Sequence, residues 1–523
     1  MNSSPSQTVP RSAASPAGTA GLLPGAIERG ASRASVALVS MLCAVILLRV
    51  ASLAGLPLMD TTEARYAEIG RKMLELGDWI TPWHDYGIPF WGKPPLSFWL
   101  TAGSMKLFGV NEFAARLPHF LCMVAVGWEC WCMAASRRKV SALVTIGLLA
   151  GAALSLLSAG AVMTDAALVL GTTLSMRGFW LALHGQHENV SRNQCSFFVG
   201  ISIGLLAKGP LALVLVGLPL MAWVIWSGQW RKARQGLPWV KGLLVSTLAV
   251  SVWYVAAELK TPGFLAYFIV GEHWHRFVTP GWSGDLYGYA HAYPPGTIWE
   301  FALLAICPWP LVLGIASLTN RHDRPAAAPV DAQDRDWLRY LVCWSLASLV
   351  FFTAARNIIL PYALPAMPAL ALLGAAWLGT SMSAQRAYAW VAAGLAVTLA
   401  SALAGGAYAL TTGTVNNDSA KAVVALWRSH GSTREPLVFV GRHMFSASFY
   451  SRGHALHEDT AEAAAKLLAP QGGYVVLDRR EVVARMNALC VTHTDKVGTF
   501  QLLRIAAKQD EARLCQHETP RRP

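Results

Sequence analysis

Long runs of apolar residues alternate with short polar segments from about residue 36 to residue 410. Most runs hold about 18 or more residues, which is enough for a helix to cross a hydrocarbon core of roughly 30 Å. The pattern predicts about eleven membrane-spanning helices, within a range of about 10 to 13. The expected spans are 36–58, 113–136, 140–160, 165–184, 196–208, 210–227, 240–258, 297–318, 338–355, 357–379 and 388–410.

The two ends of the chain lack this pattern. Residues 1–33 are rich in Ser, Ala, Pro and Gly, which predicts a disordered tail. The first span has no small-residue cleavage site, so it is typical of a retained signal anchor. Residues 411–523 are polar and alternate helix and strand signals, which predicts a small α/β domain. Its expected elements are a helix over 419–430 that stops at Gly431 and strands over 436–441, 473–477 and 500–505.

Composition and charge place the chain in a membrane. With 54% apolar and 14% charged residues, it is too apolar for an ordinary soluble multidomain protein. The chain has more basic than acidic residues, which gives a formal charge of +13, and many of these basic residues lie in short loops between spans. This placement indicates membrane topology rather than a nucleic-acid partner. The positive-inside rule then puts the N-terminus in the cytoplasm. An odd number of spans puts residues 411–523 outside.

The expected architecture is therefore an all-α polytopic membrane domain over residues 34–410, followed by an extracytoplasmic α/β domain. Two long loops, 59–112 and 259–296, lie on the outer face. The nine cysteines show no metal-ligand spacing, and most fall in apolar runs. Cys490 and Cys515 are the two outside the spans and could form a disulfide in an extracytoplasmic domain.

The first outer loop begins with a dense group of charges between two apolar runs. Asp60 precedes a helical pattern that ends at Gly77, so it can serve as an N-cap, and it can also present a carboxylate to a cavity. Arg65 lies in the first turn of the same pattern. The remaining charges of this amphipathic helix are expected on its solvated face: Glu68, Arg71, Lys72 and Glu75.

Lys93 stands directly before Pro94 and Pro95, which can begin a helix without early amide donors. A lysine held at a helix entrance near the headgroups can bind a phosphate, although snorkelling to the membrane surface explains it equally well. Asp165 begins a span, where a carboxylate is costly unless it faces protein or water. Lys208 lies in an Ala-Lys-Gly-Pro break between two apolar runs.

The second outer loop contains the sequence Glu272-His273-Trp-His-Arg276 among many aromatic residues. An H-x-H pair without a third clear ligand is a weak metal signal. We therefore expect no metal site and no required cofactor, with a divalent metal as the less favoured alternative. Further along, Arg356 precedes an apolar run interrupted by Tyr362 and two prolines, so it is expected at the outer mouth of that span.

The topology gathers these groups on one face of the membrane. The expected carboxylates are Asp60 and Asp165, and the expected cations are Arg65, Lys93, Lys208, Arg276 and Arg356. Such a cluster suits an anionic lipid headgroup, most simply a phosphate whose charge rises as a bond to it breaks. A nearby carboxylate can accept a proton from an attacking hydroxyl.

These motifs resemble the bacterial membrane glycosyltransferases of the aminoarabinose transferase and protein mannosyltransferase type. The resemblance covers about residues 36–410 and rests on motifs that are individually weak but specific together. They are Asp60-Thr-Thr-Glu-Ala-Arg65-Tyr66, Lys93-Pro-Pro-Leu96, Thr164-Asp165, Ala-Lys208-Gly-Pro210, Glu272-His273 through Arg276-Phe277, and Tyr362-Ala-Leu-Pro365.

The resemblance implies a membrane fold of the GT-C class in the bacterial inner membrane and a polyprenyl-phosphate-linked sugar as donor. It implies an extracytoplasmic acceptor, with a lipid A-like glycolipid favoured over protein or polysaccharide. Asp60 would be the catalytic carboxylate and Asp165 a second acidic residue. The donor would be held by the remaining candidates: Arg65, Lys93, Lys208, Glu272, His273, Arg276, Arg356 and Tyr362.

Two positions depart from the aminoarabinose transferase pattern. Gly92 stands where a glutamate usually precedes the Lys-Pro-Pro motif, and the lysine often found shortly before the Tyr-x-Leu-Pro segment is missing. The identity of the sugar and acceptor therefore stays open. Two other functions need a similar basic cavity: a transporter or flippase of lipid-linked sugars, and a ligase that uses a diphosphate-linked glycan.

Overall fold

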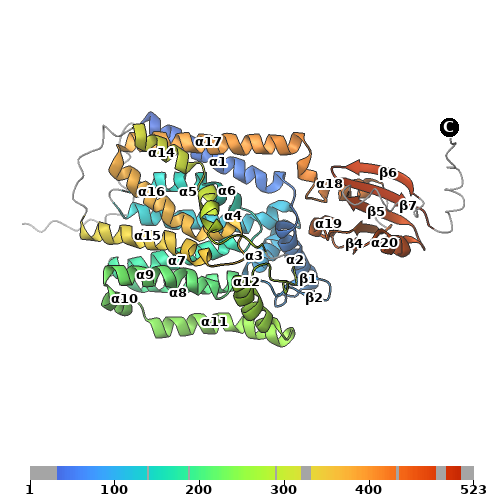
Figure 1. Ribbon diagram of the computed structural model, residues 1–523, viewed down its shortest axis with the longest axis horizontal. Helices are drawn as coiled ribbons and strands as arrows, with labels where there is room; N and C mark the ends of the chain where they lie inside the picture. The colour runs from blue at the N-terminus through green and yellow to red at the C-terminus, as the bar shows by residue number, and fades with distance from the viewer. Residues whose placement is uncertain are drawn as a thin grey trace, which may run out of the picture.

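The computed structural model describes residues 32–137, 140–185, 189–288, 291–319, 331–430, 435–478 and 491–507. Figure 1 shows a bundle of long helices with a smaller sheet-containing domain at one end. The expected tail (1–33) lies almost wholly outside the described residues, as do Gly431 and both Cys490 and Cys515.

The bundle is built from helices throughout, apart from one short hairpin. They are α1 (Arg33–Gly55), α2 (Thr62–Leu76), α3 (Leu96–Phe108), α4 (Glu112–Ala135), α5 (Ala142–Gly151), α6 (Ala153–Ser158), α7 (Asp165–His184), α8 (Val190–Lys208), α9 (Leu211–Ser227), α10 (Trp230–Gly236), α11 (Trp239–Lys260), η2 (Ala266–His275), α12 (Arg276–Val278), α13 (Thr297–Ala305), α14 (Trp309–Thr319), α15 (Ala332–Thr353), η4 (Leu360–Ala366), α16 (Met367–Ser381) and α17 (Ala384–Thr411).

Every expected span falls on helix in this structure. Two of them are broken: span 140–160 divides into α5 and α6, and span 297–318 divides into α13 and α14, which meet at a bend of 72°. By length and composition, six described helices can each cross a membrane, or seven if the bent pair is one span. The shorter α5 and α9 are also apolar. The chain is thus a multi-pass membrane protein.

Small residues allow a close contact between α7 and α8. A Cβ added at Gly171 would lie 2.7 Å from the carbonyl oxygen of Gly200, and one at Gly178 would lie 2.6 Å from the backbone nitrogen of Phe197. Backbones that approach this closely exclude larger side chains. Because α7 begins at Asp165 and α8 ends at Lys208, the same packing brings these two residues together.

The segment between α1 and α4 folds over one end of the bundle. Gly77, with a φ of 66°, ends α2 in the left-handed conformation that glycine adopts without strain. The chain then forms an antiparallel hairpin of β1 (Trp83–Asp85) and β2 (Ile88–Pro89), and α3 begins after the two prolines. This segment and the C-terminal domain lie at the same end of the molecule (Figure 1).

The C-terminal domain is a mixed five-stranded sheet with helices on both faces. Its strand order is β4-β3-β5-β7-β6, with β3 parallel to β4 and β5, and β7 antiparallel to β5 and β6. Its elements are η5 (Thr414–Asn416), α18 (Lys421–Ser429), β3 (Leu437–Val440), α19 (Phe445–Ser451), β4 (Ala455–Glu458), α20 (Ala461–Leu468), β5 (Gly473–Asp478), β6 (Val491–Val497) and β7 (Phe500–Ile505).

The helix and the three strands expected in this domain correspond to α18, β3, β5 and β7. The apolar alternation did not predict β4 or β6, the two edge strands of the sheet. Four of the seven residues of β6 are exposed, and β4 has only one buried residue in four. The domain docks through α19 on α2. At this junction the Tyr450 hydroxyl accepts from the N–H of Leu58 at 2.8 Å and donates to Glu112 at 3.0 Å.

Candidate active site

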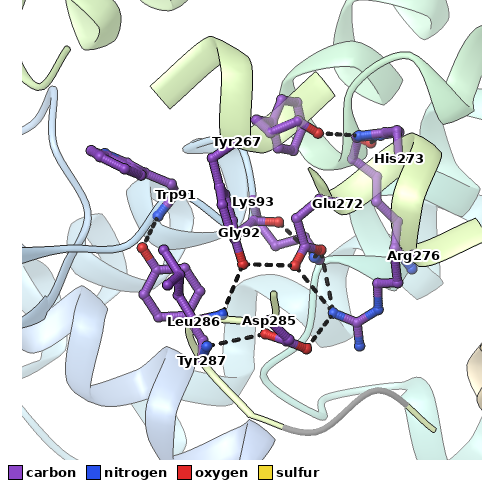
Figure 2. A network of polar contacts seen from close by, with 12 residues as sticks. Trp91, Gly92, Lys93, Tyr267, Glu272, His273, Arg276, Asp285, Leu286 and Tyr287 are labelled. Atoms are coloured by element: carbon purple, nitrogen blue, oxygen red, sulfur yellow. Dashed lines mark hydrogen bonds and ion pairs between the residues drawn. The ribbon is translucent and has the colours of Figure 1, made fainter. Parts of the chain in front are cut away.

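Lys93 lies at the entrance of α3, as expected from the two prolines that follow it, and faces a carboxylate from a distant part of the chain. Its Nζ is 2.8 Å from Glu272 Oε2 and donates to its neighbour's carbonyl, Gly92 O, at 2.5 Å. Figure 2 shows this pair at the centre of a polar network. Burial lowers the pKa of Lys93, but the charge of Glu272 outweighs it and the pKa is raised. Lys93 is therefore cationic.

Glu272 joins two cations. It lies on η2, a π-helical segment, and its side chain is 4% exposed. Besides Lys93 it contacts Arg276 Nη1 at 3.1 Å. Burial raises the pKa of Glu272, but the charges of Lys93 and Arg276 outweigh it and bring the pKa to about 2. Because π-helical turns are rare and are frequently found at functional sites, the geometry of η2 agrees with a role in binding.

Arg276 extends the network to a carboxylate that the motifs did not indicate. Its Nη1 lies 2.9 Å from Asp285 Oδ2, and Asp285 in turn accepts from the N–H of Tyr287 at 3.0 Å (Figure 2). The described contacts of Arg276 all use Nη1, which leaves Nη2 and Nε for a further acceptor. Asp285 lies in the aromatic outer loop, and its isolated charge there is the one signal that could have identified it.

Asp165 and Lys208 form a second ion pair beside this network. Lys208 Nζ lies 2.6 Å from Asp165 Oδ1, and both side chains are buried at 7% and 5% exposure. The same ammonium lies 4.9 Å from the centre of the Tyr362 ring, a cation–π contact. His273 Nε2 lies 3.2 Å from the Lys208 carbonyl oxygen. Burial lowers the pKa of Arg276, but the charge of Glu272 outweighs it and Tyr362 acts in the same direction as Glu272, so the pKa is raised and the two ion pairs share one electrostatic environment.

Arg65 approaches the network from α2. Its Nη1 donates to the carbonyl of Tyr287, and its guanidinium lies 5.4 Å from the Tyr66 ring and 5.7 Å from the Phe90 ring. Its Nε is buried and has no hydrogen-bond partner among the described residues. The structure shows no carboxylate paired with Arg65 in the part of the chain that it describes. Arg65 is thus a cation with an unused donor.

Asp60 forms no ion pair with these cations among the described residues and bonds instead to the C-terminal domain. Its carboxylate accepts from the N–H of Phe445 at 2.8 Å and from the N–H and hydroxyl of Ser446. Burial raises the pKa of Asp60 to about 6, against the opposing effect of the Ser446 hydrogen bonds. The N-cap position of α2 is Thr61, and the Asp60 carboxylate makes no hydrogen bond to that helix among the described residues. Asp60 therefore caps α19 rather than α2.

Arg356 and Asn357 lie where the chain returns toward η2. The Arg356 side chain is exposed, and its N–H donates to the carbonyl of Phe277 at 2.9 Å. Asn357 is 4% exposed and was not a candidate. It donates to the carbonyls of Arg276 at 2.6 Å and Thr279 at 2.7 Å and accepts from the N–H of Gly281 at 3.0 Å. It fixes the backbone that carries Arg276.

The polar face of α2 is not solvated, contrary to the expectation from its pattern. Glu68 is 0% exposed, Arg71 5% and Lys72 1%, whereas Glu75 alone is open at 44%. Arg71 pairs with Glu68 at 2.7 Å, and Lys72 pairs with Asp85 of the hairpin at 2.7 Å. The prediction was wrong because the hairpin covers this face, and helical periodicity cannot distinguish solvent from a polar partner.

Two histidines of the second outer loop do not form a metal site with each other. His273 bonds to the carbonyls of Phe268 and Lys208, while His275 is exposed and its ring is stacked on Trp282 at 6.2 Å. Within the described ranges, the one group of three residues with converging metal-ligating atoms lies elsewhere, in the C-terminal domain.

Comparison with known proteins relates this arrangement to membrane transferases. Residues 36–268 match the family described as dolichyl-phosphate-mannose-protein mannosyltransferase. The chain is also similar to two proteins named undecaprenyl phosphate-alpha-4-amino-4-deoxy-L-arabinose arabinosyl transferase. The one from Aeromonas salmonicida is 27% identical over 61% of this chain and 56% of the relative. The one from Pseudomonas fluorescens is 29% identical over 61% of this chain and 54% of the relative.

The alignment thus spans about half the length of these curated relatives. A solved structure, ArnT from Cupriavidus metallidurans bound to undecaprenyl phosphate, shares the fold with a TM-score of 0.70. It is 18% identical and covers 89% of this chain and 97% of that one. The apo structure of the same protein gives a TM-score of 0.69. The resemblance predicted from the motifs and the predicted fold class are both confirmed.

Proposed function

We propose, from the chain's place among membrane glycosyltransferases of the aminoarabinose transferase and protein mannosyltransferase type, that it transfers a sugar from a polyprenyl-phosphate carrier to an acceptor of the cell envelope. The reaction takes place at the outer face of the bacterial inner membrane. In this orientation the N-terminus is cytoplasmic and the C-terminal domain is periplasmic. No metal or other cofactor is required.

This proposal rests on the hydrogen-bond donors of Arg65, Lys93 and Arg276 that have no partner in the described part of the chain. Arg65 Nε is buried without a partner, and the Nε and Nη2 of Arg276 are free of described contacts. Lys93 uses one donor on Glu272 and one on Gly92, so its third can also reach a ligand. The phosphate of a lipid-linked sugar, a diester in the donor and a monoester once the sugar has left, offers the acceptor oxygens and the negative charge that these groups lack.

In the proposed transfer, negative charge develops on the carrier phosphate as it leaves the sugar. An oxygen of the acceptor forms a bond to the anomeric carbon of the sugar, while the bond from that carbon to the carrier phosphate breaks. The bonding electrons go to the phosphate, whose charge Lys93 and Arg276 stabilise. If the attacking oxygen is a hydroxyl, its proton passes to a carboxylate, for which Asp60 is our candidate with Asp165 as the second. Lys208 and Tyr362, which are in cation–π contact beside this network, would also contact the donor.

A glycolipid like lipid A is the acceptor that the family resemblance favours. The position before Lys93 is distinctive, because a Cβ at Gly92 would lie 2.9 Å from the Phe90 ring. That ring packs on Tyr287 at 4.6 Å between centroids. A glutamate at residue 92 would therefore displace Phe90 and reshape the wall of the donor site. We expect the sugar to be one whose recognition does not use a carboxylate at this position.

The test uses the full-length protein in vesicles that contain a polyprenyl-phosphate sugar and an envelope lipid extract, with product detection by mass spectrometry. The expected result is a new glycosidic bond on an envelope lipid. Movement of the donor across the bilayer without a new bond would instead identify a transporter. Transfer from a diphosphate-linked donor alone would identify a ligase.

The variant Asp60→Asn tests the carboxylate. We expect transfer to fall by about 100-fold or more, while binding of the polyprenyl-phosphate donor persists. The exposed Glu300→Gln, at the start of α13, is the matched control and should keep full activity. Full transfer by Asp60→Asn would assign the proton acceptor to another group.

A further inference from the structure

A cluster of imidazole and carboxylate side chains lies in the C-terminal domain, outside the site described above. His430 follows the last turn of α18, and His493 and Asp495 lie two residues apart on β6. One ligating atom of each residue lies within 4.8 Å of those of the other two. We propose that His430, His493 and Asp495 bind a zinc ion that joins α18 to the edge strand β6.

The local backbone directs both β6 side chains toward α18. A register shift between Val491 and His493 interrupts the pairing of β6 with β7, as in a β-bulge. Val491 packs with the core on the α20 side of the sheet, whereas Val497 packs with the core that contains α18. The bulge therefore turns the side chains after it to the α18 face. Bulges commonly re-aim side chains in this way at binding sites.

The two distances from the carboxylate oxygen to the imidazole nitrogens are close to those of a tetrahedral zinc site. Asp495 Oδ2 lies 3.0 Å from His493 Nε2 and 3.4 Å from His430 Nε2. Ligand atoms bound to zinc at about 2.0–2.2 Å in tetrahedral geometry lie about 3.3–3.6 Å apart. Small side-chain rotations are enough to place all three atoms on one ion. The fourth position would face solvent, because His493 is 55% exposed.

The carboxylate oxygen at the centre of the cluster lacks a hydrogen bond. Asp495 Oδ2 is buried and faces the two imidazole nitrogens, but it accepts no hydrogen bond from the described residues, so a cation shared with both rings would satisfy it. The His430 ring is held against Tyr474, with their centroids 5.8 Å apart and the planes inclined by 24°. Two imidazoles and one carboxylate favour zinc over calcium or magnesium, which prefer oxygen ligands throughout.

The site is independent of the transfer reaction, so its effect is on the domain itself. β6 is the outermost strand of the sheet, in the order β4-β3-β5-β7-β6. A metal bound to both β6 and the end of α18 cross-links this edge to the helix that covers it. Such a link stabilises the folded state as long as the unfolded chain binds the ion less well.

The experiment titrates the chelator-stripped, full-length protein in detergent with Zn²⁺ by calorimetry, and with Co²⁺ by visible absorption. The wild-type protein is expected to show one site with a Co²⁺ spectrum of tetrahedral nitrogen and oxygen ligation. His493→Ala and the near-isosteric Asp495→Asn should each weaken this site by about tenfold or more. The exposed His454→Ala, in the same domain, is the matched control and should bind as the wild type does.

Circular dichroism of each apo variant shows whether its fold is kept, and Asp495→Asn preserves the side-chain shape. Zinc should also slow hydrogen exchange in β6 of the wild type but not of Asp495→Asn. Equal zinc affinity in the wild type and both site variants would overturn the proposal. A Co²⁺ spectrum dominated by thiolate charge transfer would overturn it as well, since this site contains no cysteine.

Discussion

Asp60 shows how one residue can serve two parts of the molecule. Its carboxylate binds the first backbone amides of α19, in the C-terminal domain, while its backbone N–H donates to the carbonyl of Asp418 at 2.7 Å. Burial shifts its pKa into the range in which a carboxylate can exchange protons near neutral pH. The residue proposed as proton acceptor is therefore also a docking contact.

This environment predicts the pH dependence of transfer. Because burial raises the pKa of Asp60 to about 6, the carboxylate form is lost as the pH falls through about 6. The rate of sugar transfer, measured in vesicles between pH 4.5 and pH 8, should therefore fall about tenfold per unit below that midpoint. Acid does not destabilise the fold through Asp60, since a raised pKa means that the folded state favours the protonated form.

The Ser446→Ala variant checks the assignment of this midpoint. The Ser446 hydroxyl donates to Asp60 and lowers its pKa, so removing it should move the midpoint of the rate profile to higher pH. An unchanged midpoint in Ser446→Ala would mean that a group other than Asp60 governs the profile.

At the scale of elements, the backbone of the second outer loop is held by the side chain of Asn357, which lies after α15. Asn357 bonds to three backbone groups around Arg276, and a buried amide of this kind is costly to remove because its partners lose their hydrogen bonds. The ion pairs of Arg276 with Glu272 and Asp285 require that this backbone stays in place.

The Asn357→Ala variant should therefore loosen residues 276–281 without unfolding the bundle. We expect faster hydrogen exchange confined to this segment and donor affinity weaker by about tenfold, which corresponds to about 1.4 kcal/mol. Hydrogen exchange and binding of a polyprenyl phosphate measure the two effects. Asn189→Ala, at an exposed position before α8, is the control. Unchanged exchange over 276–281 would contradict the clamp.

At the scale of the whole molecule, three histidines pack where the hairpin meets the C-terminal domain. The His443 and His457 rings are stacked at 3.9 Å, and His84 of the hairpin stacks on His443 at 6.3 Å. Burial lowers the pKa of His84 to about 4 and that of His457 to about 3, and it also lowers the pKa of His443. The charge of neighbouring Lys72 also lowers the pKa of His84 and His457, while the charge of Asp85 raises it.

Acid should therefore weaken the docking of the C-terminal domain. A histidine whose folded-state pKa is lowered contributes stability that is complete above its unfolded pKa of about 6.5 and is lost as the pH falls toward about 4. Hydrogen exchange of α19 and β4, corrected for intrinsic rates, should rise between pH 6.5 and pH 4.5. In His457→Phe the rise should be shallower, because one titrating group is gone. A flat profile in the wild-type protein would exclude this mechanism.

The sequence by itself determined the local features of this protein. Apolar run length located the helices of the bundle, and the two prolines after Lys93 located the start of α3, because both signals lie within a single continuous stretch of the chain. The breaks at Gly77 and at Lys208-Gly-Pro likewise marked the ends of α2 and α8. Motif residues far apart in the chain were grouped correctly where an ion pair joins them, as in Asp165 with Lys208.

The tertiary structure alone decided which partners these residues have. Glu272 meets Lys93 across 179 positions, and Asp60 meets Ser446 across 386, so neither contact leaves a periodic signal. The polar face of α2 was expected in solvent and is buried, because the hairpin supplies Asp85 to Lys72. A charged residue looks the same in a sequence whether water or an opposite charge satisfies it, and only the packing of distant segments selects between the two.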